Sequence, residues 1–152
     1  MKYTFFILII MLSMFSCQKS LEGIQGDTIK LSTDKLFSPA EGGEFEVATE
    51  GKFWWVDRGI SVDSKFYGFR CDSMCNNNYW SYNDIEFPIE TNLKDFYDIV
   101  KIEGPWFTIH KVSEQKIIFT ILPNDTEKDR TLILGLDAGN FGTSVTLTQS
   151  AN

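Results

Sequence analysis

The sequence predicts an all-β protein built as an antiparallel β-sandwich, and three observations support this prediction. Short segments of alternating apolar and polar residues recur along the chain, and this is the period of a strand with one buried face. Turn-forming residues separate the segments at spacings typical of antiparallel sandwiches. Only residues 92–100 have a helical pattern, in which Asn92 would cap a single turn.

Three of the alternating segments lie in the first part of the domain. Residues 28–32 alternate, and a turn-rich break follows at 39–43. Residues 44–49 place Phe45 and Val47 on one face and glutamates on the other. Residues 52–56 are rich in aromatic side chains. Because neighbours on a strand point to opposite faces, one of Trp54 and Trp55 is expected in the core.

The C-terminal part adds three strands. Residues 116–122 are apolar on both faces, as in a central strand. Residues 131–136 follow a charged segment at 123–130, which we interpret as a hairpin turn, and residues 143–149 direct Val145 and Leu147 inward. Residues 106–110 also alternate; they assign Trp106 to the core and end at His110, the single histidine.

The N-terminus has the pattern of a bacterial lipoprotein signal. Lys2 supplies a positive charge, residues 3–12 are apolar but too short for a comfortable membrane span, and the small Ser16 precedes Cys17. We expect a signal peptide at 1–16 and a lipid with palmitate-type chains on Cys17. Residues 17–27 would form a flexible tether with a reach of about 18 Å, and residues 28–150 the domain. An ordinary signal peptide with a chance cysteine is the alternative.

The net charge of the chain limits the classes of partner that it can bind. Removal of the signal leaves 13 basic and 21 acidic residues, a net charge of −8. An acidic domain repels phosphate backbones, so nucleic acid is not an expected partner. Anionic lipid heads offer it no attraction either, so the lipid would provide the membrane attachment. Glu22 is the single acid in residues 18–22, which favours the periplasmic face of the outer membrane over the cell surface.

Cys71 and Cys75 remain as a pair once Cys17 is lipidated. In an exported protein such a pair predicts a disulfide. It would close a very small loop and contribute about 2 kcal/mol. Free thiols and a reactive or metal-binding pair are the alternatives; redox pairs are normally spaced C-x-x-C, and zinc would need two further ligands.

Residues 66–84 combine aromatic rings with asparagines. Sugars pack their C–H faces on rings and hydrogen-bond to amides, and exposed aromatic loops usually mark interaction sites. The candidate ligand-binding residues are Tyr67, Asn78, Tyr79, Trp80 and Tyr82. A disulfide would hold the loop ready for binding. The alternative is that these rings are buried as a satellite core.

The sequence indicates neither a catalytic nor a metal site. His110 has no G-x-S-x-G serine to activate, and no carboxylate pair is marked out as a glycosidase would require. The acidic segment 124–129 places Arg130 where a calcium loop needs glycine. We therefore expect a non-catalytic protein without a cofactor.

Several motifs in order resemble one known family. The strand at Phe45 leads to Trp54, Trp106 follows, and the tail runs from Asn124 and Arg130 to a closing strand that ends in Gln149. This order is similar to the BACON domain (Bacteroidetes-associated carbohydrate-binding often N-terminal). The resemblance covers residues 28–149 except about 57–102, an inserted loop region with the cysteine pair. It implies an immunoglobulin-like sandwich in an envelope lipoprotein of a Bacteroidetes cell.

Two functions are compatible with these observations. One is a module that binds a polysaccharide through the aromatic loop. The other is a structural module that contacts an envelope protein without binding sugar.

Overall fold

The computed structural model describes the backbone of residues 28–51, 53–71, 78–82, 85–92 and 95–152, and within these ranges all side chains except those of residues 58, 69–87 and 92–97. Cys17, Cys75 and the expected signal peptide and tether lie outside this part of the chain. The described strands are β1 (Lys30–Leu31), β2 (Lys35–Ser38), β3 (Gly43–Glu50), β4 (Trp55–Val62), β5 (Lys65–Cys71), β6 (Asn78–Tyr82), β7 (Ile85–Asn92), β8 (Asp95–Glu103), β9 (Phe107–Ser113), β10 (Lys116–Ile121), β11 (Arg130–Asp137) and β12 (Gly142–Gln149).

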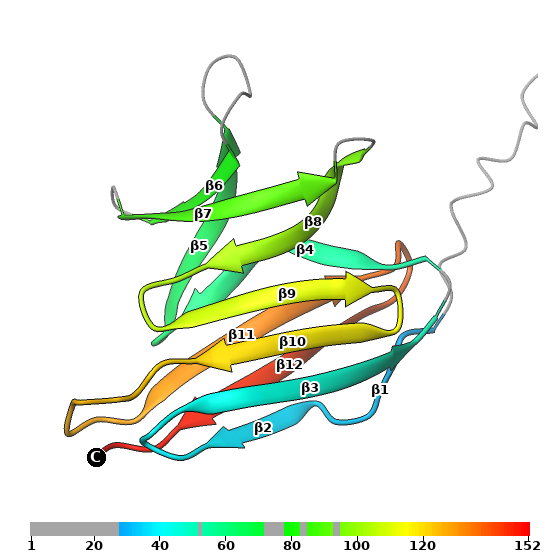
Figure 1. Cartoon of the computed structure of the whole chain (residues 1–152). Coiled ribbons are helices and arrows are strands. Elements are labelled where there is room, and N and C mark those ends of the chain that lie inside the picture. Colours follow the sequence, from blue (N-terminus) through cyan, green and yellow to red (C-terminus); the bar gives the residue numbers. More distant parts are fainter. Residues whose placement is uncertain (1–27, 52, 72–77, 83–84, 93–94) are drawn as a thin grey trace, which may run out of the picture.

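These strands form two six-stranded sheets packed as a sandwich (Figure 1). The first sheet has the order β1-β3-β10-β9-β8-β7, and the second has the order β6-β5-β4-β11-β12-β2. The β6–β7 hairpin hydrogen-bonds the two sheets together along one side. Among the described strands, every pair is antiparallel except β12 with β2, which is parallel. The predicted all-β antiparallel sandwich is confirmed.

The N-terminal segment contributes one strand to each sheet and closes the other side of the sandwich. β1 pairs with β3 in the first sheet, whereas β2 pairs with β12 in the second. Between them, the Ser32 amide donates to the Ala48 carbonyl at 2.9 Å, and the Thr146 amide donates to the Asp34 carbonyl at 2.9 Å. One short segment therefore satisfies backbone groups at the edges of both sheets, which would otherwise lack partners.

The core lies between the sheets and follows the predicted alternation. Buried side chains alternate along β3, β10, β11 and β12, with Val47, Phe119, Leu134 and Leu147 all fully buried. β10 lies between β3 and β9, as expected of a strand that is apolar on both faces. Trp106 is in the core, as predicted. Of the adjacent pair, Trp54 is buried and Trp55 is half-buried, so one of the two is in the core, as expected.

Three expectations about the middle and the tail were wrong. Residues 92–100 do not form a helical turn: β7 ends at Asn92 and β8 begins at Asp95, so pairing with neighbouring strands overrides the local spacing. The region 57–102 is built of strands β4 to β8 rather than of an inserted loop. The segment 123–130 is not a hairpin turn, because it joins β10 in one sheet to β11 in the other.

Candidate functional site

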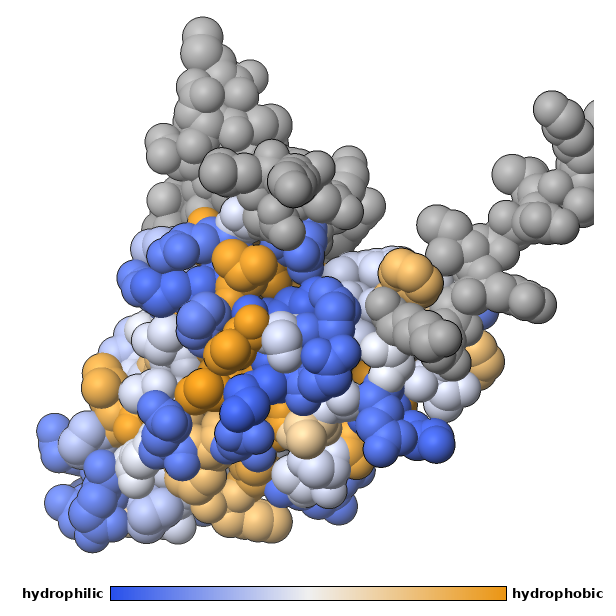
Figure 2. Space-filling model, turned by 45° about the vertical axis from the view of Figure 1, so that its right-hand side comes forward, coloured by the Kyte–Doolittle hydropathy of each residue, from blue (hydrophilic) through white to orange (hydrophobic). Residues whose placement is uncertain are grey.

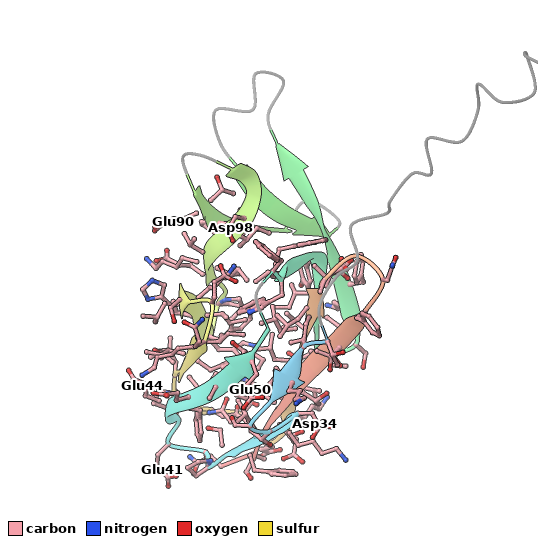
Figure 3. The ribbon with its side chains drawn as sticks, turned by 90° about the vertical axis from the view of Figure 1, so that its right-hand side faces the viewer. Asp34, Glu41, Glu44, Glu50, Glu90 and Asp98 are labelled. Carbon is pink, nitrogen blue, oxygen red and sulfur yellow. The ribbon has the colours of Figure 1, made fainter. Side chains whose placement is uncertain are left out.

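An outward-facing surface of the second sheet combines exposed apolar side chains with hydroxyl groups. We call it the Phe66 face, and the two sheets are seen edge-on in Figure 3. It is formed by side chains of β2, β12, β11, β4 and β5: Lys35, Phe37, Ser61, Phe66, Thr131, Ile133, Ser144, Thr146 and Thr148. Phe66 is 62% exposed and Phe37 is 73% exposed.

Strand pairing aligns part of this face into one row. The row runs across five strands through Lys35, Thr146, Ile133, Ser61 and Phe66. Because neighbouring strands lie about 4.8 Å apart, the row is about 19 Å long. This length is that of several sugar units rather than of a small metabolite.

The β4–β5 hairpin positions Phe66. Asp63 and Ser64 form its two-residue turn with φ angles of 48° and 65°, which is the backbone twist that a tight hairpin requires. The Asp63 amide donates to the Thr131 carbonyl, and the Thr131 amide donates to Asp63 Oδ1, both at 2.8 Å. These bonds fix the hairpin against β11.

Two glycines allow side chains to lie flat on the sheet. Phe66 lies over Gly59, where a Cβ atom would collide with the ring, and Gly68 pairs with Gly59 across the strands. The side chain of Asp57 covers Gly135 in the same way, since a Cβ atom there would meet Asp57 Cβ at 2.9 Å. An aromatic ring thus replaces missing glycine side chains while one face stays open to solvent.

The chemistry of the Phe66 face suits a flat, neutral and partly apolar ligand. The ring of Phe66 and the 38% exposed Ile133 can pack against C–H groups. The hydroxyls of Ser61, Thr131 and Thr146 can both donate and accept hydrogen bonds. Within the described residues, no group of three histidine, cysteine, aspartate or glutamate side chains could hold a metal ion.

One of the residues predicted from the sequence to bind a ligand is buried in the structure. Tyr67 is 5% exposed and belongs to the hydrophobic core, which agrees with the core alternative rather than with an exposed ring. Phe66, its neighbour, faces the other way and is the exposed ring. The sequence did not single out Phe66. Alternation along β5 could have indicated that Phe66 and Tyr67 face opposite ways, but which of them is exposed depends on the Asp63–Ser64 turn.

The other candidate residues belong to strands whose side chains lie outside the described part. Cys71 ends β5, and Asn78, Tyr79, Trp80 and Tyr82 lie on β6. In the backbone register, Trp80 pairs with Phe69 on one side and Phe87 on the other. The ligand-binding and disulfide predictions for these residues stay predictions.

The described outer face of the first sheet carries charged side chains. His110 is exposed there and lies in register between Ile118 and Lys101. Lys101 forms ion pairs with Glu103 and Glu90. The hydrogen bond to Glu103, and then that to Glu90, raises the pKa of the Lys101 ammonium. Figure 2 shows this mixed polar surface, and Glu44 and Glu90 project from it in Figure 3.

A buried lysine organises one end of the sandwich. Lys111 Nζ lies 2.9 Å from Asp98 Oδ1 and 3.0 Å from Glu114 Oε1, donates to the Trp54 carbonyl at 3.1 Å, and sits 4.3 Å from the centre of the Trp54 ring. Trp54 Nε1 and Thr49 Oγ1 both donate to the Glu114 carbonyl, at 2.8 Å and 2.6 Å. This cluster holds the β9–β10 turn over the core.

The residues of the family resemblance close the opposite end. Gln149 Nε2 reaches the carbonyls of Leu122, Ala40 and Pro39 at 2.8, 3.2 and 3.4 Å. Asn124 Nδ2 donates to the carbonyls of Lys128 and Ser150, both at 2.9 Å.

Arg130 joins this closure from the start of β11. Its guanidinium lies 5.6 Å from the centre of the Trp106 ring and donates to the Pro123 carbonyl at 3.2 Å. These motif residues therefore hold strand ends together, which is a structural role.

Comparison with known proteins identifies the fold and no more. A solved structure from Bacteroides thetaiotaomicron, described as an NMR structure of the protein from that organism, is similar to this chain with a TM-score of 0.54. The two share 18% sequence identity over 87% of this chain and 93% of the other. No protein-family model and no curated protein matches the chain. Among the described residues, no helix is long and apolar enough to cross a membrane.

Proposed function

We propose that this chain is a non-catalytic lipoprotein module of the cell envelope that binds a neutral polysaccharide on the Phe66 face. The observation that carries the proposal is the exposed ring of Phe66, which lies over Gly59 near the hydroxyl side chains of Ser61 and Thr146. The lipoprotein-type N-terminus and the BACON resemblance support an envelope role. Lipidation of Cys17 and attachment to the periplasmic face of the outer membrane are part of the proposal.

The negative charge of the protein favours a neutral polysaccharide over an anionic one. The net charge of −8 expected for the processed chain opposes the approach of uronic-acid or sulfated polymers. The Phe66 face carries Lys35 at one side, and Asp57 lies beside the face over Gly135. The other residues that define the face are hydroxyl or apolar. Neutral polymers that present alternating C–H faces and hydroxyls match this pattern.

Affinity electrophoresis tests the proposal directly. The processed chain with Cys17→Ser is run in native gels that contain starch, xylan or mannan. Phe66→Ala should weaken any retardation by at least about fivefold, which corresponds to roughly 1 kcal/mol. Phe66→Tyr keeps the ring and should bind as the parent chain does.

Phe141→Ala is the matched control, because Phe141 is a 48% exposed phenylalanine in the turn after β11 and lies away from the Phe66 face. Its removal should leave retardation unchanged. Equal loss in the Phe66 and Phe141 variants, or undiminished binding by Phe66→Ala, would exclude this face as the binding surface.

A protein partner is the second candidate, and one observation favours it. β2 is the last strand of its sheet, and it carries Phe37, which is 73% exposed. An apolar ring on an edge strand is a typical feature of a protein interface. Cross-linking in intact cells distinguishes the two candidates. A photoreactive phenylalanine analogue at position 37 should give a discrete protein adduct if the partner is a protein. If the ligand is a polysaccharide, no protein adduct should form, and Phe37→Ala, which lies off the row, should weaken retardation less than Phe66→Ala does.

A further inference from the structure

One end of the sandwich brings together exposed apolar side chains and the start of the described chain. The β3–β4 connection carries Phe53, 70% exposed, and the β11–β12 turn carries Phe141, 48% exposed. Both are near the pairing of Trp55 with Asp137, since Asp137 also pairs with Gly142. Val112, at the end of β9, is 47% exposed. Figure 2 shows apolar groups on this end, at the right of the view.

The chain enters the domain at this same end. Ile29 is 9% exposed and lies against Gly51, where a Cβ atom would be 3.9 Å from Ile29 Cα and 3.7 Å from Trp54 Cδ1. Lys30 then pairs with Glu50 at the end of β3. The start of the described chain is thus held by the core beside Trp54. In Figure 1 it lies at the right of the view, at the end of the sandwich away from the C-terminus.

The length of the preceding segment decides which end can reach a lipid surface. Ten residues separate Cys17 from Thr28, and a polar segment of this length has a reach of about 18 Å. β11, with eight residues, is about 26 Å long. A lipid on Cys17 therefore keeps the Phe53–Phe141 end near the bilayer and leaves the Gln149 end away from it.

The charges of this end oppose such a contact only weakly. Glu50 pairs with Lys30 at 3.7 Å, and Lys111 lies 3.0 Å from Glu114 and 2.9 Å from Asp98. Asp137 Oδ1 accepts the Gly139 amide at 2.7 Å. The carboxylates nearest the apolar side chains are thus paired or hydrogen-bonded, which reduces their repulsion from anionic head groups, although the Lys111 cluster keeps one net negative charge.

We propose that Phe53 and Phe141 insert into the head-group region of the membrane and orient the domain upright on it. This inference rests on the proposed lipidation of Cys17. Aromatic side chains favour the membrane–water interface, and two rings on turns held by paired strands would fix an orientation that a single anchor leaves free. Val112 lies at the margin of the contact.

Photo-cross-linking of the full lipidated chain tests the inference. A photoreactive phenylalanine analogue replaces Phe53, Phe141, Phe37 or Phe66 in turn, and the protein is reconstituted in vesicles of phosphatidylethanolamine with a minority of phosphatidylglycerol. Phe37 and Phe66 are matched controls, being phenylalanines of comparable exposure on another surface. Lipid adducts at positions 53 and 141 should exceed those at 37 and 66 by at least about tenfold.

The readouts separate this inference from the proposed anchor. Vesicle flotation and the mass of the Cys17 peptide report the anchor alone, and a chain that neither floats nor carries lipid overturns both. A lipidated, floating chain with equal adducts at all four positions, or none at 53 and 141, overturns only the orientation. Protein adducts at 53 and 141 in intact cells would overturn it too, because they would show that a protein covers this end.

Discussion

Replacing Gln149 by Met should destabilise the domain by about 3 kcal/mol. Gln149 is fully buried, and its amide reaches three carbonyls from two other strand ends. An amide group has two N–H donors, so the substitution removes two hydrogen bonds, each worth about 1 kcal/mol net. It also takes the side-chain donor from the Leu122 carbonyl, at about 1–3 kcal/mol, while the Ala40 and Pro39 carbonyls keep backbone donors. Loss of Gln149 Oε1, which is buried without a partner, offsets about 1 kcal/mol of this cost. Met keeps the volume, so cavity formation adds little.

Urea unfolding followed by tryptophan fluorescence measures this loss. Total stabilities of such domains are about 5–15 kcal/mol, so the variant should remain folded at 25 °C but melt roughly 10 °C lower. Thr148→Val, on the neighbouring residue and the opposite face of β12, is the control and should change stability by less than about 0.5 kcal/mol.

A charged variant refines the same test. Gln149→Glu would direct a carboxylate at the three carbonyls, which disfavours the ionised form and raises the pKa of the new group in the folded state. Since the folded pKa exceeds the unfolded value of about 4.3, stability should increase as the pH falls from 7 towards 4.3. The Met variant should show no such recovery. If Gln149→Met unfolds at the parental urea concentration, Gln149 does not hold the sheets together.

Further predictions concern the other end and the charged face. Lys111→Met should cost about 2–4 kcal/mol in urea unfolding, because it leaves Asp98 without the ammonium that it contacts at 2.9 Å; adding Asp98→Asn should recover part of that loss, and additive losses would contradict the pairing. The pKa of the Lys101 side chain, measured by NMR, should lie above 10.5 because its ion pairs raise it. The stability that Lys101 contributes should therefore be fully present below pH 10.5 and should be lost as the pH rises through the folded pKa. A titration midpoint at or below 10.5 would contradict this. Gly42→Ala should destabilise by more than about 2 kcal/mol, because Gly42 has φ +78° and a Cβ atom would lie 2.9 Å from the Leu122 carbonyl carbon; an unchanged melting temperature would show that the turn can relax.

The strands that pack against two neighbours with regular alternation could be predicted from sequence. The predicted segment 44–49 became β3, 131–136 became β11 and 143–149 became β12, each within one residue at either end. Their inward positions carry apolar residues without interruption, so the period of two is visible locally. Fold class follows from several such segments.

Strands β7 and β8 could not be predicted, and the reasons are local. Pro88 lies inside β7, where proline argues against a strand. Register shifts between Glu90 and Thr91, and between Thr91 and Asn92, interrupt the period. The apolar residues after Asn92 then imitate helical spacing, and only pairing with β9 shows the extended conformation.

The candidate site could not be predicted from the sequence either, but for a different reason. The exposure of Phe66 depends on the two-residue turn at Asp63–Ser64, and its flat placement depends on Gly59 lying beneath it on another strand. Neither relation is encoded next to Phe66 in the chain. Tyr67, by contrast, looked suitable by composition alone, and the same turn directs it into the core.

The residues that stabilise the fold differ from those proposed to bind a ligand, which limits what the fold can imply about function. Gln149 and Asn124, which belong to the family-like motif, have their polar groups engaged in closing one end. A chain can therefore keep these residues for folding whatever it binds, so a shared fold at 18% identity predicts no ligand. The surface that would choose a ligand is formed by outward-facing side chains of β2, β4, β5, β11 and β12, and Gln149 and Asn124 are not among them. If the Phe53–Phe141 end faces the membrane, the strands stand along the membrane normal and the row from Lys35 to Phe66, which crosses them, runs parallel to the bilayer. A polysaccharide lying along that row would therefore run parallel to the membrane surface.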